Sequence, residues 1–593
     1  MKWDLDKIYK GFDSKEFTED FKNINLNIDN LREYINSNLW SESGEKFLNY
    51  FEEVVLKFEE ISIIYGKLHS FVFLKLSCNA NDKVAMDNEL KLRDLSVDII
   101  LIQTTIVKNL SKKESIDLSN HETLKEYEFF IKDLIDEGKH LLSDEQEETM
   151  AILNNFGAYS FSSLQETLIS KYKVTIEENG ELKEIPLTEC RSLLESNCKE
   201  TRKKALEAEK KLYKYMEDPI AFALNNIKKS VIYDTKKRGY QCPLSRSLKQ
   251  NRISKEIFDS LIGAIEESLP FFREFLKLKA ELLGNENKKV AFSDLFVSTL
   301  KSNKEVDFKF AKNFLIDNFH SFSNEFGDYV EKAFNNNWID SGIYEGKVGG
   351  AFCDFISHIG ESRILLNFTN SYDSIFTLAH ELGHGYHGEA IKNEREFNKH
   401  YPMVIAETAS IFSETLICDK AYNMADETEK IIILEYELNS AAQTIVDIYS
   451  RFLFEKEVFD RCENEFLTPE VLNEIMVNAQ KATYGDAMDE EYFGYAWIYK
   501  GHYYIFDNNF YNYPYAFGHL FSLGLYDLYL KDKDSFHEKY NTILRNSAKK
   551  NIKDIGDMCS LNLENKEFFL NSINILKNKF LKYKELVTKN LNK

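Results

Sequence analysis

Apolar residues recur at three- and four-residue spacing through most of this chain, and few residues interrupt them. The clearest run is residues 42–77, ESGEKFLNYFEEVVLKFEEISIIYGKLHSFVFLKLS. Apolar positions at this spacing form one face of an amphipathic helix. Only 7 Pro and 24 Gly occur in 593 residues, so helices are seldom broken. The sequence therefore predicts a mostly α-helical fold, with a run of amphipathic helices over about residues 14–155.

The chain length and one hairpin signal predict where the chain divides. A chain of 593 residues is several times longer than a typical domain, so we expect two lobes. The segment KYKVTIEENGELKEIPL places two alternating runs around Asn179-Gly180, which predicts a β-hairpin. We place the boundary just after it. This gives an N-terminal helical lobe at 1–190 and a second domain at 191–593.

Charge and cysteine content argue against several kinds of partner. The net charge is −22, whereas nucleic acids and anionic membranes attract clustered Lys and Arg. The eight Cys show no C-x-x-C pair, which predicts reduced thiols in a cytoplasmic protein. The opening MKWDLDKIYK has no apolar signal-peptide core, and we expect no membrane-spanning helix. We expect a monomer, with an oligomer as the alternative.

The segment HELGH, residues 380–384, carries the strongest chemical signal in the chain. Two His four residues apart lie on one face of a helix, so His380 and His384 can bind the same Zn²⁺. Glu381 lies beside them. There it can act as a general base that takes a proton from a metal-bound water. The pattern predicts a catalytic zinc site with two ligands on one helix.

The residues before and after this motif predict a loop, a strand and a helix. Residues 342–356, GIYEGKVGGAFCDFI, are rich in Gly and predict a loop. The apolar run in SRILLNFTN predicts a strand at Ile364–Phe368. The pattern of SYDSIFTLAHELGHGYHGEA predicts that the metal-binding helix begins at Ser371 or Asp373. Three glycines between residues 383 and 388 indicate that it ends soon after the motif.

A catalytic zinc needs a third protein ligand. The metzincin pattern fails, because position 387 is His and position 390 is Ala. Three ligands on one straight helix cannot surround an ion tetrahedrally, so we interpret His387 as a substrate-binding or supporting residue. The apolar helix predicted over residues 402–422 carries Glu407 and Glu414 on one face, and a buried carboxylate needs a partner. Small residues beside Glu407 favour the metal as that partner; the alternative is a solvated pair of carboxylates.

Several motifs together resemble one known family, the oligoendopeptidase F branch of the thimet oligopeptidase family of zinc metallopeptidases. GKVGGAFC, ILLNFT, FTLAHELGHGYHG and AETASIFSE occur in an order and at spacings similar to those of that branch. The opening WDLDKIY is also similar to its usual start. The likeness covers most of the chain and is strongest over about residues 340–420. This combination is more specific than H-E-x-x-H alone.

The resemblance implies a nearly all-helical fold in which two lobes enclose a deep substrate channel, with a small β-sheet beside the zinc site. It implies cleavage of short peptides with one Zn²⁺ per chain, held by His380, His384 and Glu407. The ILLNFT segment would be an edge strand that pairs with an extended substrate by β-augmentation. The GKVGG glycines would form a mobile loop over the cleft.

The resemblance also implies a His followed by a Tyr-rich stretch that stabilises the tetrahedral intermediate. The segment GHYYIFDNNFYNYPYAFGH supplies His502, Tyr511, Tyr513 and Tyr515. It departs from the family pattern, because Gly501 stands where Pro often precedes the His and the following gap is longer. We expect His502 with Tyr511 or Tyr513 to stabilise the oxyanion. The alternative for any single Tyr is packing in the core.

The sequence therefore predicts a zinc-dependent endopeptidase that hydrolyses short oligopeptides through a metal-activated water. Glu381 would take the proton of that water and deliver it to the leaving amine. Asp373 and Glu414, each seven residues from a predicted ligand, are candidates for orienting the ligands. One alternative is a zinc carboxypeptidase or dipeptidyl carboxypeptidase, which needs a basic residue for a C-terminal carboxylate. The other is a non-catalytic peptide-binding protein on the same scaffold.

Overall fold

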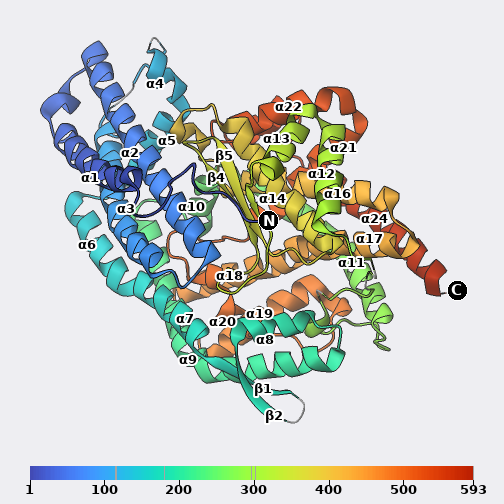
Figure 1. The fold of residues 1–593 in the computed structure, drawn as a ribbon. Helices are drawn as coiled ribbons and strands as arrows, with labels where there is room; N and C mark the ends of the chain where they lie inside the picture. The colour runs from blue at the N-terminus through green and yellow to red at the C-terminus, as the bar shows by residue number, and fades with distance from the viewer. Residues whose placement is uncertain are drawn as a thin grey trace.

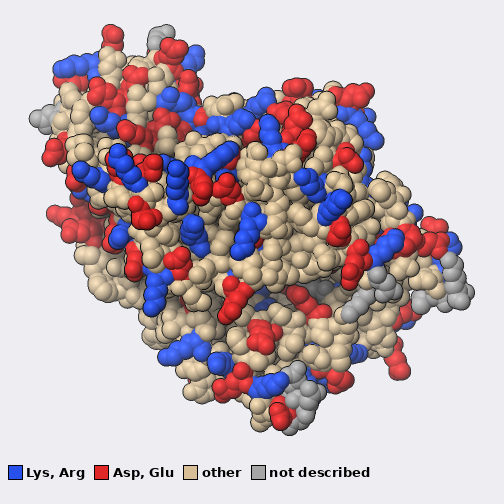
Figure 2. Space-filling model, viewed as in Figure 1, with Lys and Arg blue, Asp and Glu red and all other residues tan. Residues whose placement is uncertain are grey.

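The computed structural model describes residues 1–113, 116–119, 121–178, 181–295, 297–300, 302 and 304–591. Within this part of the chain, helices make up most of the structure and the strands form two small sheets, so the predicted mostly α-helical fold is confirmed. In Figure 1 the first helices lie at the upper left and the last helix reaches the C-terminus at the right. Acidic and basic side chains are interspersed over the face shown in Figure 2.

The helices and strands follow one another along the chain as follows. The first part forms α1 (Lys15–Ile35), α2 (Gly44–Cys78), α3 (Lys83–Leu110), α4 (Glu122–Glu126), α5 (Glu128–Gly138), α6 (Asp144–Asn154) and α7 (Ser160–Lys171). The middle part forms β1 (Lys173–Glu178), β2 (Glu181–Pro186), α8 (Leu187–Ser192), α9 (Lys199–Lys237), α10 (Pro243–Gln250), α11 (Lys255–Leu282), α12 (Phe308–Phe322), α13 (Asn324–Asn335), β3 (Ile339–Asp340), β4 (Ala351–Ile356) and β5 (Glu361–Leu366). The last part forms α14 (Tyr372–Ile391), α15 (Met403–Ala406), α16 (Thr408–Met424), α17 (Glu427–Ala441), α18 (Ile448–Cys462), α19 (Pro469–Tyr484), α20 (Ala496–Tyr499), α21 (Tyr513–Lys531), α22 (Lys533–Asn546), α23 (Ile552–Met558) and α24 (Lys566–Leu591).

Buried apolar side chains form two clusters, which divide the chain between Leu134 and Ala158. The first cluster draws on α1 to α5 and adds only Ile356 and Phe397 from the rest of the chain. The second cluster takes in the remaining helices and the three-stranded sheet. The predicted hairpin is present as β1 and β2, which pair antiparallel, and Val174 and Ile176 bury it in the second cluster. The turn Asn179-Gly180 lies outside the described residues, and the boundary at residue 190 stays a prediction.

The sheet of β3, β4 and β5 corrects two expectations about the segment before the metal-binding helix. The strand order is β3-β5-β4, so β5 is the central strand, and the ILLNFT segment that begins in it is not an edge strand. Its apolar side chains are buried on both faces, as suits a strand with neighbours on both sides. The two edge strands are the two-residue β3 and the longer β4, which pairs antiparallel with β5 and lies in the predicted loop. The glycines at 349 and 350 end just before this strand, so they mark its start.

The metal-binding helix α14 begins where the sequence predicts, since Ser371 caps it by accepting the N–H of Ser374. The prediction that glycines end it early is wrong, because the helix continues to Ile391. The glycines instead allow close packing. A Cβ on Gly383 would lie 2.5 Å from the Ala409 carbonyl oxygen of the next long helix. Gly385 and Gly388 face Tyr329 and Phe355 at similarly short range, so α14 is in contact on several sides.

The helix predicted over residues 402–422 is interrupted at Glu407. This residue ends α15 and precedes α16, with φ −82° and ψ 0° instead of helical values. Helix α21 packs directly on the break, because a Cβ on Gly518 would lie 2.9 Å from the Glu407 Cβ. The Ser522 hydroxyl donates to the Thr408 carbonyl at 3.0 Å. The break in the helix and the packing of α21 on it together hold the Glu407 side chain against α14.

The structure also bears on two features of the chain, its cysteines and its most apolar helix, α2. All eight cysteines are free thiols, as predicted. Helix α2 differs from the expectation, since it is long and apolar enough by composition to cross a membrane. In the fold, however, its residues Phe51, Val54 and Ile61 are fully buried in the N-terminal cluster. Of its most apolar stretch, 39% is buried, so packing in the fold accounts for part of the apolar composition.

The close contact between α14 and α16 generates a prediction. Gly383→Ala should lower the free energy of unfolding by about 1–3 kcal/mol, because the new methyl group meets backbone atoms that cannot rotate away. The matched control is Gly66→Ala in α2, where an added Cβ meets nothing within 4 Å. That variant should gain up to about 1 kcal/mol from helix propensity. Urea unfolding of both variants measures the difference, and equal stability of the two would contradict the packing argument.

Candidate active site

Helix α14 brings His380 and His384 onto one face, one turn apart. Their ring centroids are 5.0 Å apart and their planes are inclined by 78°. The Glu407 Oε2 atom lies 3.3 Å from His380 Nε2 and 3.6 Å from His384 Nε2. All three side chains are half-buried, and their candidate ligand atoms lie within 4.8 Å of one another. Two imidazole nitrogens and one carboxylate oxygen form a donor set that fits Zn²⁺ and leaves one position for water.

Two further contacts fix the orientation of these donors. The Glu414 Oε2 atom lies 2.9 Å from His380 Nδ1, so this carboxylate accepts the Nδ1 proton and leaves Nε2 free as a donor atom. The Ser410 hydroxyl donates to Glu407 Oε2 at 2.8 Å. The role expected of Glu414 in orienting a ligand is therefore compatible with the structure. Asp373 is exposed two turns before His380 and makes no such contact among the described residues.

The ionisation of the three candidate ligands reflects their mutual contact. Burial disfavours charge on His380, but hydrogen bonds with Glu407 and Glu414 outweigh it and raise its pKa. Burial lowers the pKa of His384 to about 4, with help from the positive charge of His380. Burial alone would raise the pKa of Glu407, yet contact with the two imidazoles lowers it to about 2. The carboxylates are thus arranged to hold positive charge at this point.

Glu381 lies on the same helix, next to the first histidine, and is 6% exposed. Burial raises its pKa to about 7, and the negative charges of Glu407 and Glu414 act in the same direction. No hydrogen bond to its carboxylate is found among the described residues. A buried carboxyl group with a pKa near neutrality can both accept and release a proton, which is the property that a general base needs.

The aromatic segment after α20 reaches the same region through Tyr511 and Tyr515. The His502 ring lies 4.4 Å from the Tyr511 ring, which lies 6.0 Å from the Tyr515 ring. Tyr515 precedes Gly518 by one turn on α21, so it lies on the face that meets Glu407. Burial, Tyr511 and then Glu407 raise the Tyr515 pKa, which is consistent with this position. The sequence predicts Tyr511 or Tyr513 as the oxyanion donor.

The structure places Tyr513 elsewhere. It is 1% exposed, its hydroxyl donates to the Ser247 carbonyl at 3.4 Å, and its ring packs edge-on against Phe258. The physical reason is the start of α21 at this residue. Alternate residues share a face in an extended chain, but each helical residue turns by about 100°, so Tyr513 and Tyr515 point in different directions. Tyr513 is therefore packed in the core, whereas Tyr515 lies on the face of α21 that meets Glu407.

Comparisons with known proteins agree with this geometry. A family model described as Peptidase family M3 matches residues 192–575. The chain belongs to Peptidase family M3. A second model, described as Oligopeptidase F, matches residues 108–173 and confirms the resemblance to the oligoendopeptidase F branch. Membership in this family makes the chain a metalloendopeptidase, an enzyme that hydrolyses peptides.

Curated relatives and a solved structure extend the likeness over the chain. Oligopeptidase PepF of Bacillus subtilis is 27% identical over 433 residues, which cover 72% of this M3 peptidase and 63% of that protein. An oligoendopeptidase F homolog of Lactococcus lactis is 24% identical and covers 99% of this chain and 98% of its own. The crystal structure of oligoendopeptidase-F from Enterococcus faecium has a TM-score of 0.72 at 18% identity, covering 97% of this chain and 99% of that one. At that identity the solved structure shows a shared fold.

In this M3 peptidase His387 is a core residue. Its Nε2 atom lies 2.8 Å from the Ser547 hydroxyl, and its ring stacks on Tyr401 at 4.0 Å. Burial lowers its pKa to about 3, so the ring stays neutral. His387 is therefore not a third histidine ligand, and it supports the loop that leads into α15. The sequence could not distinguish this role from contact with substrate.

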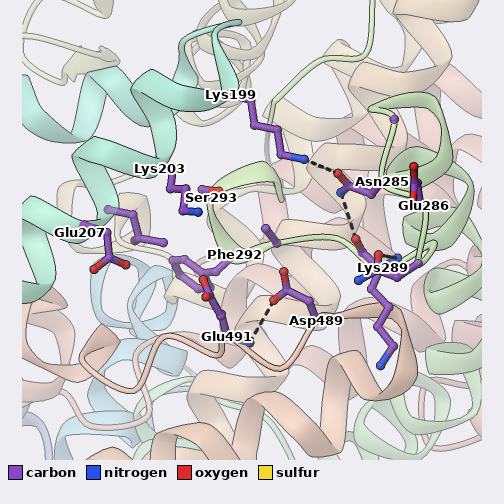
Figure 3. Close-up of a pocket in the computed structure, with 14 residues that line it drawn as sticks. Lys199, Lys203, Glu207, Asn285, Glu286, Lys289, Phe292, Ser293, Asp489 and Glu491 are labelled. Atoms are coloured by element: carbon purple, nitrogen blue, oxygen red, sulfur yellow. Dashed lines mark hydrogen bonds between the residues drawn. The ribbon is translucent and has the colours of Figure 1, made fainter.

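Two cavities approach the metal-binding helix from different sides. One, of about 780 Å³, is lined by Asp373 and Tyr436, near the start of α14 and near Glu414. The other, of about 630 Å³, is lined by Tyr401 beside His387 and by residues of α3 and α5 from the N-terminal cluster. A third cavity, of about 440 Å³ and shown in Figure 3, is lined by none of the candidate site residues. None of the three is lined by His380, Glu381, His384 or Glu407.

Proposed function

We propose that this M3 peptidase is a zinc-dependent endopeptidase of short oligopeptides, with one Zn²⁺ held by His380, His384 and Glu407. The observation that carries the proposal is the convergence of these three donor atoms, from α14 and the break before α16, within 4.8 Å. Glu414 would keep His380 in the tautomer that binds a metal. Bound Zn²⁺ supplies a Lewis acid that polarises the scissile carbonyl and acidifies a water molecule.

The protein's own groups would move the protons. Glu381 accepts a proton from the attacking water and delivers it to the nitrogen of the leaving amine. Its burial makes this exchange favourable near neutral pH, because its pKa lies near 7. The two nearby carboxylates keep the imidazoles oriented while the charge of the substrate changes.

Tyr511 and Tyr515 would donate hydrogen bonds to the carbonyl oxygen as it gains negative charge. His502 Nδ1 lies 3.0 Å from Asn512 Oδ1, an oxygen that can only accept, so the neutral ring carries its proton there. Burial and the charges of Arg451 and Lys500 lower the His502 pKa, which favours this neutral form. His502 therefore supports Tyr511 by packing against its ring, and the two phenols are the donors.

The substrate class follows from the edge strand and the cavities. The free edge of β4 offers unpaired backbone groups to an extended peptide, the role that the sequence analysis assigned to the next strand. The cavities near α14, of about 630 and 780 Å³, have volumes that suit a peptide segment rather than a folded domain. The names of the relatives, oligopeptidase and oligoendopeptidase, describe the same class. We propose a cytoplasmic monomer, which the eight free thiols support.

Removal of the proposed base tests the function. The wild-type protein should cleave a quenched fluorescent peptide of about ten residues and leave casein intact. Glu381→Gln should keep the fold and the zinc but lose turnover by several orders of magnitude, because an amide cannot accept the proton. Zinc analysis and kcat are measured on the same preparation. Near-normal turnover by this variant, or rapid digestion of casein by the wild type, would contradict the proposal.

The two neighbouring tyrosines on α21 give a matched test of the oxyanion donors. Tyr515→Phe should lower kcat by about 100- to 1000-fold with KM little changed, because one hydroxyl that donates to the transition state is lost. Tyr513→Phe should leave kcat within about 3-fold, since that hydroxyl donates to the Ser247 carbonyl in the core. If Tyr513→Phe shows the larger fall, the assignment from the structure is wrong.

A further inference from the structure

Lys500 is a cation of the aromatic segment to which the proposed chemistry assigns no contact with substrate. It lies between α20 and the 3₁₀ turn Gly501–Tyr504, two residues before His502. Lys500 is half-buried, so part of its side chain remains exposed to solvent. Its ammonium lies 4.9 Å from the centre of the Tyr499 ring, and no ion pair or hydrogen bond joins it to any other described residue.

The charged groups around Lys500 are already paired with one another. Arg191 donates to Glu209 at 3.1 Å and lies over the Tyr499 ring at 3.7 Å. Arg451 pairs with Asp447 and also donates to Asn512 Oδ1 at 3.3 Å. Asp447 and Glu209 also attract the ammonium of Lys500. These two carboxylates face three cations, Arg191, Arg451 and Lys500, so one positive charge is left over in this group.

The charged group that contains Lys500 reaches the proposed oxyanion residues through Arg451. Asn512 Oδ1 accepts from Arg451 and also lies 3.0 Å from His502 Nδ1, whose ring packs on Tyr511. A positive charge that is partly removed from water and has no partner destabilises the folded protein. Burial lowers the Lys500 pKa, which is consistent with that cost. A ligand that supplies a negative charge would offset it.

We propose that Lys500 binds a carboxylate of the peptide substrate, and so contributes to specificity in the proposed peptidase. The carboxylate is either an Asp or Glu side chain at one position of the peptide or the free C-terminal group. Both are available in oligopeptides, and both form charge-assisted hydrogen bonds with an ammonium. This inference rests on the proposed function, because it concerns how that activity selects among peptides.

Paired peptides distinguish the two sources of the carboxylate. One pair has the same cleavable sequence with a free acid or an amide at the C-terminus. Other pairs differ by Glu or Gln at a single position, scanned along the peptide. In the wild-type protein one pair should show about 10-fold higher kcat/KM for the carboxylate member, mainly through KM. Equal cleavage of every pair would overturn the inference and leave the proposed function intact. Cleavage of no peptide at all would overturn both.

Variants then assign the preference to this lysine. In Lys500→Gln the 10-fold preference should fall below about 2-fold, and Lys500→Arg should recover part of it. The matched control is Lys203→Gln, an exposed lysine that lines the separate cavity of Figure 3 and should leave the preference unchanged. Zinc content and Tm check that each variant is folded, and Lys500→Met replaces the Gln variant if that one is not. A preference that survives removal of the charge would overturn the assignment.

Discussion

The close packing of α14 on α16 is the contact on which the rest of the site depends. Only a glycine fits at position 383, because the Ala409 carbonyl oxygen would lie 2.5 Å from any Cβ there. This approach brings the break at Glu407 within reach of both imidazoles. Helix α21 completes the arrangement from the other side through Gly518. Helices α14, α16 and α21 thus meet around Glu407 because Gly383 of α14 and Gly518 of α21 have no side chain at their points of contact.

Electrostatics explains why this meeting point suits a cation. His380 lies between two carboxylates, Glu407 on one nitrogen and Glu414 on the other. Behind Glu414, the C-terminal helix supplies Lys579, which pairs with Asp419 at 3.0 Å and with Glu437. Lys579 offsets part of the negative charge of Asp419 and Glu437, which lie behind Glu414. Around the proposed ligands themselves an excess of negative charge remains. A divalent ion would balance this excess where the three donors converge.

Sequence reasoning predicted the parts of the site that depend on helical spacing. His380 and His384 lie on one face of α14, as their four-residue spacing predicts. Glu407 and Glu414 both contact His380, although the helix predicted to carry them is interrupted at Glu407. The parts that depend on where an element begins could not be predicted. Helix α21 begins at Tyr513, which turns this side chain into the core and leaves Tyr515 beside Glu407. Likewise β4 begins directly after two glycines, so the Gly-rich pattern that indicated a loop concealed the edge strand.

Metal content tests the central claim most directly, and α14 offers its own control. The account predicts one Zn²⁺ per wild-type chain after dialysis against zinc-free buffer, measured by atomic emission. His380→Ala should lose nearly all of it, because a donor atom is removed from the convergent set. His387→Ala, two turns further along the same helix, should keep it, because that ring contacts Ser547 and Tyr401 instead. Full zinc occupancy in His380→Ala, or equal loss in both variants, would contradict the account.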